Sequence, residues 1–155
     1  MNIDDLGHLT IRSAGVRDIA GVLGLWAAAG SVPTVSDSPD GLTRLLVTDP
    51  QALLVAELED VLAGSLIAAW DGWRGSFYRL AVAPEHRRKG LATALLKEGE
   101  RRLRERGAIR LTAIVADDED GAMGFWCAAG YERQEHRARF VRHPHAQRQA
   151  HMSDE

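Results

Sequence analysis

Several features that the sequence lacks exclude particular classes of protein. Its 155 residues include one cysteine, Cys127, which excludes an internal disulfide framework and a metal site built from several cysteines. No apolar run reaches the roughly 18 residues that a membrane-spanning helix needs. The first residues, Met1–Asp5, are acidic where a secretory signal peptide would be basic and then apolar. We therefore expect a cytoplasmic protein without a metal ion and without a membrane partner.

The net charge is small, but the charged residues are unevenly distributed along the chain. The formal net charge is −3, with 26% charged and 45% hydrophobic residues, which is typical of one globular domain. Residues 79–110 contain ten basic and four acidic side chains, whereas residues 1–78 contain four basic and ten acidic ones. A basic band in an acidic chain favours a local anionic ligand over a nucleic-acid partner.

Hydrophobic periodicity predicts an α/β domain with no internal repeat. Period-two alternation and apolar runs predict strands, and spacings of three and four predict helices. We expect one domain over residues 1–142, built from one mixed sheet covered by helices. A flexible tail is expected at 143–155. The predicted strands are 9–12, 52–58, 61–70, about 74–82, 109–115 and one starting at Tyr131, and the predicted helices are 16–27, 42–48, Gly90 to Gly107 and 122–129.

Residues 80–92 (LAVAPEHRRKGLA) contain the strongest chemical signal in the chain. A strand ends near Ala83, three consecutive cations follow at 87–89, and Gly90 precedes a long helix. The first amides of a helix have no internal acceptor, and the helix dipole adds positive potential there. Small residues at Gly90 and Ala92 allow a phosphate to approach the backbone closely. The segment therefore predicts a phosphate site that is neither a Walker loop nor a dinucleotide fingerprint, because both glycine patterns are absent.

At these residues the sequence resembles the GCN5-related N-acetyltransferase (GNAT) family. Residues 87–92 (RRKGLA) match the motif Gln/Arg-x-x-Gly-x-Gly/Ala, and residues 80–85 (LAVAPE) match the strand and Pro-Glu that precede it. Residues 122–131 (AMGFWCAAGY) resemble the second signature, Ala-x-x-Phe-Tyr-x-x-x-Gly-Phe. The resemblance extends from residue 9 to about 142 and is tightest over 75–132.

The resemblance implies a fold, a reaction and a coenzyme site. The implied fold is α/β (α+β), a single mixed, mostly antiparallel sheet flanked by helices, with the fourth and fifth strands splayed apart. The implied reaction is direct transfer of the acetyl group of acetyl-CoA to a primary amine of a small molecule or protein in a ternary complex. Acidic residues at 37–40 and 57–60 favour such a cationic acceptor. The implied coenzyme-binding residues are Leu80, Ala81, Val82, Arg87, Arg88, Lys89, Gly90, Leu91, Ala92, Thr93, Phe125 and Trp126.

The catalytic groups follow the family pattern less closely. Many members have Tyr, a thiolate-protonating acid, at the position of Trp126, and some have a basic Glu at the position of Ser76. An Asn is often found at the position of Glu119. Period two places Tyr78 on the strand face of Ser76, Leu80 and Val82, within reach of a thioester. Tyr78 and Glu119 are therefore the catalytic candidates.

Two other functions remain open from the sequence. The missing Tyr and Glu motivate a non-catalytic acyl-CoA-binding module, and the basic residues 87–110 motivate a nucleic-acid-binding protein. Because dimers are common in the family, a homodimer is a further expectation.

Overall fold

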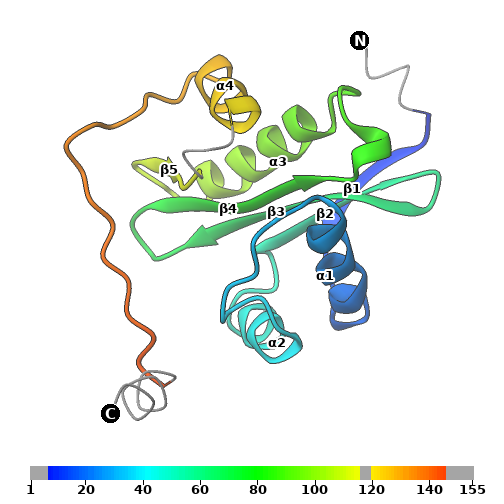
Figure 1. The fold of residues 1–155 in the computed structure, drawn as a ribbon, viewed down its shortest axis with the longest axis horizontal. Helices are drawn as coiled ribbons and strands as arrows, with labels where there is room; N and C mark the ends of the chain where they lie inside the picture. The colour runs from blue at the N-terminus through cyan, green and yellow to red at the C-terminus, as the bar shows by residue number, and fades with distance from the viewer. Residues whose placement is uncertain (1–6, 116–119, 146–155) are drawn as a thin grey trace.

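The protein folds around one five-stranded sheet. The computed structural model describes residues 7–115 and 120–145. The strands lie in the order β1-β2-β3-β4-β5; the first four pair antiparallel with one another, and β5 is parallel to β4 (Figure 1). The expected mixed, mostly antiparallel sheet is confirmed. The strands are β1 (Leu9–Ser13), β2 (Leu53–Leu58), β3 (Val61–Trp70), β4 (Gly75–Val82) and β5 (Leu111–Ala113).

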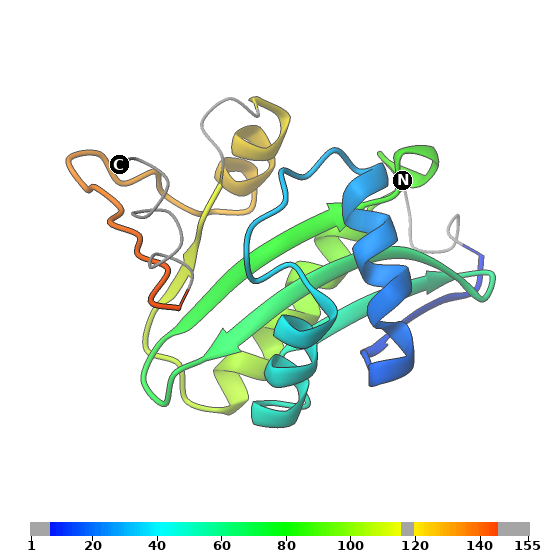
Figure 2. The same ribbon diagram turned by 60° about the horizontal axis from the view of Figure 1, so that its bottom comes forward.

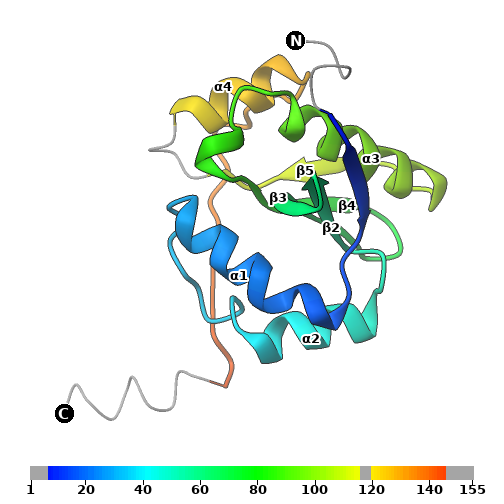
Figure 3. The same cartoon turned by 90° about the vertical axis from the view of Figure 1, so that its right-hand side faces the viewer.

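Helices cover both faces of the sheet. Helices α1 (Ile19–Ala28) and α2 (Pro39–Thr48) lie on one face, and α3 (Leu91–Glu105) and α4 (Asp120–Ala128) lie on the other (Figure 3). Helix α2 begins three residues before the predicted start. The Ser38 hydroxyl accepts a hydrogen bond from the backbone N–H of Gly41 at 3.0 Å, and Pro39 occupies the first turn. Both features favour a helix start at this position.

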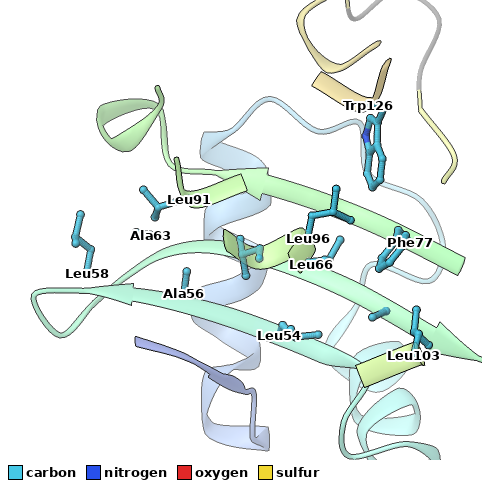
Figure 4. Packing of buried hydrophobic residues seen from close by; sticks show 12 residues of the cluster. Leu54, Ala56, Leu58, Ala63, Leu66, Phe77, Leu91, Leu96, Leu103 and Trp126 are labelled. Carbon is cyan, nitrogen blue, oxygen red and sulfur yellow. The ribbon is translucent and has the colours of Figure 1, made fainter. Parts of the chain in front are cut away.

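The sheet separates two hydrophobic clusters. Leu54, Leu66 and Phe77 pack with α3 and with Trp126 of α4 (Figure 4). On the opposite face, Leu53 and Val55 pack with α1 and α2. Strand β2 is therefore buried on both faces over residues 53–56, which explains the apolar run there.

One predicted element is wrong and another is shorter than predicted. Residues 131–145 contain neither a strand nor a helix, although a strand starting at Tyr131 was expected. Residues 132–139 are almost all charged or polar, so they offer no apolar face to pack against the sheet. The strand expected over 109–115 is confined to Leu111–Ala113. In the described ranges no helix is long and apolar enough to span a bilayer.

Candidate active site

Strand β5 pairs only with the first three residues of β4. The ladder joins Gly75, Ser76 and Phe77 to residues 111–113, and one further bond runs from the Ile114 N–H to the Phe77 carbonyl at 3.5 Å. From Tyr78 to Val82, β4 has no ladder with β5, and the two strands diverge (Figure 2). The expected splay is confirmed, and it leaves backbone groups of β4 available to a ligand.

A β-bulge shapes the part of β4 beyond the ladder. Ile67 pairs with Tyr78 and Ser65 pairs with Ala81, so two residues of β4 stand opposite one residue of β3. Arg79, one of the two, has φ 54°. The extra residue reverses the alternation of side chains along the strand.

The bulge overturns one expectation about Tyr78. Tyr78 packs with the cluster under α1 and α2, whereas Leu80 and Val82 pack with the cluster under α3. The prediction that Tyr78 shares a face with Leu80 and Val82 was wrong, because strict period two does not hold across a bulge. Tyr78 is half-buried, and Ala81 points to the same side as Tyr78.

Buried hydrogen bonds support the bulge. The indole Nε1 of Trp26 donates to the Ser65 hydroxyl at 2.8 Å, and that hydroxyl donates to the Arg79 carbonyl at 3.3 Å. Ser65 is fully buried. Sequence reasoning assigned no role to Ser65, although a single hydroxyl inside the apolar run 61–70 indicates a buried polar contact.

The Arg79 side chain ties the loop between α1 and α2 to β4. Its Nε donates to Asp37 Oδ1 at 3.2 Å, and its Nη2 contacts Asp37 Oδ2, the Val32 carbonyl at 3.1 Å and Thr34 Oγ1 at 3.4 Å. The guanidinium also lies 5.5 Å from the centre of a Trp26 ring. The loop between α1 and α2 therefore contacts β4 close to the point where β4 diverges from β5. This relationship was not predicted from the sequence.

The start of α3 has the features of an anion site. Arg88 and Gly90 adopt positive φ, 63° and 85°, and α3 starts at Leu91 without a side-chain cap and without an acidic residue in its first turn. The N–H groups of Leu91, Ala92 and Thr93 therefore have no acceptor within the helix. A Cβ on Gly90 would meet open space, so the positive φ is the feature that favours glycine.

The cations of this loop differ in their contacts. Arg87 is exposed, and its Nη2 donates to the Ala29 carbonyl at the end of α1 at 3.1 Å. Lys89 Nζ lies 3.2 Å from His86 Nδ1, and Arg88 is exposed.

Along α3, by contrast, Arg101 and Arg102 pair with glutamates of the same helix. Three consecutive cations of the band thus lie in the loop before α3.

A cavity of about 290 Å³ lies between α3 and α4. Thr93, directly after the first sequence motif, and Phe125, from the second motif, line the same space. Trp126 instead packs inward: it is 8% exposed, and its ring centre lies 5.8 Å from Phe77 and 5.0 Å from Tyr131. Lys97 also lines the cavity and was not among the predicted residues. Other lining residues are Leu96, Glu100, Ala128 and Ala129.

The described residues supply few proton-transfer groups. The Tyr131 hydroxyl donates to Glu100 Oε2 at 2.8 Å, and burial together with this carboxylate raises the pKa of Tyr131. Tyr131 is therefore a weaker acid than a free tyrosine. Ser76 Oγ lies 3.2 Å from Thr112 Oγ1, and Glu119 lies outside the described residues. Within 7–115 and 120–145 no group of three His, Cys, Asp or Glu side chains could hold a metal ion.

Comparison with known proteins agrees with this geometry. Residues 24–131 match the acetyltransferase (GNAT) family. An acetyltransferase of Yersinia pestis (strain Pestoides F) is 35% identical over 127 residues, covering 82% of this chain and 90% of the relative. Among solved structures, the PaiA N-acetyltransferase of Thermoplasma acidophilum in complex with coenzyme A has a TM-score of 0.71 at 15% identity, covering 84% of this chain and 94% of that one.

A second solved structure has the same fold. AAC(6')-Iy in complex with the bisubstrate analogue CoA-S-monomethyl-acetylneamine has a TM-score of 0.69 at 21% identity, covering 88% of this chain and 99% of that one. The family match spans more than half of the sequence, and the fold, the splayed strands and both sequence motifs agree with it. The chain belongs to the GNAT family of acetyltransferases.

Proposed function

We propose that the protein binds acetyl-CoA where β4 leaves β5 and transfers its acetyl group to a primary amine of a small molecule or protein. The observation that carries the proposal is the proximity in sequence and fold of two features. Strand β4 ends at Val82 with an edge not paired to β5, and eight residues later Gly90 precedes the uncapped start of α3. A strand edge and a helix start suit, respectively, the amide arm and the pyrophosphate of the coenzyme.

Each part of the coenzyme has candidate partners. Backbone groups of Leu80, Ala81 and Val82 would bind the pantetheine arm as a neighbouring strand does. The amides from Arg88 to Thr93 would hold the pyrophosphate, with long-range attraction from Arg87 and Lys89. Phe125 would line the opposite wall of the coenzyme site. Trp126 would pack against Phe125 from the hydrophobic core.

The chemistry requires one bond to form and one to break. A neutral amine attacks the thioester carbonyl, the C–N bond forms, the C–S bond breaks, and the thiolate of coenzyme A leaves. The amine loses one proton and the thiolate gains one. A backbone N–H near Val82 would stabilise the oxyanion. Tyr78 and Glu119 are the proposed proton-transfer groups, and water would relay protons where they do not reach.

The amine character of the acceptor has support of two kinds. The solved neighbour AAC(6')-Iy is described as an aminoglycoside N-acetyltransferase, which supports an amine as the acetylated group. The acidic surface of the chain supports a cation less directly, because Asp37 is paired with Arg79 and Glu57 is paired with Arg12. The acceptor class is therefore proposed mainly from the family.

A thiol-release assay tests the proposal. Exposed Cys127 would itself react with a thiol reagent, so the assay uses the Cys127→Ala protein with acetyl-CoA and a panel of polyamines, aminoglycosides and peptides with free amino termini. We expect acetyl-CoA to bind, and coenzyme A to be released with at least one amine. Binding without release for every amine would favour a non-catalytic acyl-CoA-binding module. Failure to bind acetyl-CoA would refute the site itself.

A further inference from the structure

Two arginines fix the loop between α1 and α2 at both of its ends. Arg87, in the loop before α3, donates to the Ala29 carbonyl at the end of α1, at 3.1 Å. Arg79, at the bulge of β4, holds Asp37 at the other end. Residues 31–36 (SVPTVS), here called the SVPTVS loop, lie between these two contacts and pass alongside β4 (Figure 2). The SVPTVS loop therefore borders the proposed coenzyme site from the phosphate end to the unpaired part of β4.

The surface of the SVPTVS loop is apolar and uncharged. Val32 is 78% exposed, Val35 is 63% exposed, and Pro33 between them is exposed as well. None of the six residues carries a charge. A group of exposed apolar side chains beside a ligand site is typical of a surface that the ligand covers. Contact with an apolar group would be favourable, because it would remove this surface from water.

The polar groups of the loop are already bonded to one another or to β4. The Asp37 carboxylate binds the Arg79 guanidinium and accepts the Thr34 N–H at 2.8 Å. The Val32 carbonyl accepts from Arg79 at 3.1 Å. The Thr34 and Ser36 hydroxyls lie 3.1 Å apart. An acceptor with several positive charges would have to displace Arg79 from Asp37, whereas an apolar group needs no polar partner here.

We propose that the acceptor is an amine with an apolar substituent, and that this substituent packs on Val32, Pro33 and Val35 while the amine nitrogen attacks the thioester. Aliphatic amines and peptides whose first residue is apolar share this chemistry. The inference rests on the proposed acetyl transfer and names its acceptor class. The bonds that form and break are those of that transfer, with the new C–N bond on the amine of the apolar acceptor.

Matched acceptors test the acceptor class in the thiol-release assay with the Cys127→Ala protein. The peptides Leu-Gly-Gly-Gly and Asn-Gly-Gly-Gly differ in the polarity of a first side chain with the same branching, and 3-methylbutylamine is compared with spermidine. We expect kcat/KM to be about 10-fold or more higher for the apolar member of at least one pair. A preference in the peptide pair would assign the acceptor to peptide termini, and a preference in the amine pair alone would assign it to small amines.

The same assay separates failure of this inference from failure of the proposed function. Equal or faster release with the polar member of both pairs would overturn the apolar acceptor and leave acetyl transfer standing. Release with no amine at all would refute acetyl transfer, and the apolar acceptor with it.

Matched valine substitutions test where the apolar substituent packs. Val→Thr keeps the branched shape and adds a hydroxyl. The exposed Val47 on α2 and Val61 at the start of β3 supply the control, at 76% and 57% exposure. We expect kcat/KM for the preferred apolar amine to fall about 5-fold or more in Val32→Thr/Val35→Thr and to stay unchanged in Val47→Thr/Val61→Thr. The affinity for acetyl-CoA should be the same in both. Equal kcat/KM in the two double variants would overturn the proposal.

Discussion

Arg79, at the bulge of β4, is hydrogen-bonded to Asp37, at the end of the loop between α1 and α2, with its Nε 3.2 Å from Asp37 Oδ1. The two side chains are 20% and 10% exposed, so most of the pair is shielded from water. The contact joins residues 42 positions apart in the sequence. It fixes the loop beside the part of β4 that the coenzyme is proposed to occupy.

Removing the Asp37 carboxylate should loosen this loop. Asp37→Ala leaves the Arg79 guanidinium without its charged partner and removes the acceptor of the Thr34 N–H, at 2.8 Å. We expect a loss of about 1–3 kcal/mol in the free energy of unfolding and faster hydrogen exchange at residues 32–37. The exposed Asp40, in the first turn of α2, supplies the control Asp40→Ala. Equal exchange in the two variants would contradict the role of the pair.

Ser65→Ala should destabilise the bulge. The substitution leaves the buried Trp26 indole N–H without an acceptor and the Arg79 carbonyl without its hydroxyl donor. We expect a cost of about 1–3 kcal/mol in urea unfolding, more than for Ser76→Ala on β4. A double-mutant cycle with Trp26→Phe should show a coupling of about 0.5–1.5 kcal/mol. Additive effects of the two substitutions would mean that the hydrogen bond contributes little.

Gly90→Val should weaken acetyl-CoA binding more than it weakens the fold. Valine at φ 85° is strained by about 1–2 kcal/mol, and its branched side chain crowds the amides at the start of α3. Gly107, after the other end of α3, has φ 95° and equally open surroundings, so Gly107→Val is a matched control. Calorimetric titration should show affinity reduced about 10-fold or more in Gly90→Val only. Similar affinities in both variants would refute the phosphate site.

The Arg12–Asp18 pair should make stability depend on pH in acid. The hydrogen bond from Arg12 and a further bond from the Gly15 N–H lower the pKa of Asp18 to about 2. A carboxylate with a lowered pKa stabilises the fold above its ordinary pKa of about 4, and this contribution is lost as the pH falls towards 2. The stability difference between wild type and Asp18→Asn should therefore be constant near neutral pH and shrink between about pH 4 and 2. On an Arg12→Gln background the pH-dependent part should largely disappear.

Local sequence patterns predicted most of the secondary structure. The hairpin of β2 and β3, the long helix α3 and the turn at Glu59 and Asp60 follow from contiguous residues, because periodicity and turn preferences act over a few positions. The shape of the loop before α3 was also predictable, since the strand end, the cations, Gly90 and the helix start are adjacent in the chain, and its phosphate-binding role stays a prediction. The strand expected at Tyr131 did not form because residues 132–139 supply no apolar face.

The sequence by itself determined most of the element types, the two motifs and the family, since each depends on residues that are close together in the chain. The tertiary structure alone decided which residues meet across the sheet. Ser65 of β3 and Trp26 of α1 support the bulge at Arg79, because the Ser65 hydroxyl donates to the Arg79 carbonyl and accepts from the Trp26 indole N–H. That bulge turns Tyr78 away from Leu80, a reversal that strict alternation along a strand cannot indicate.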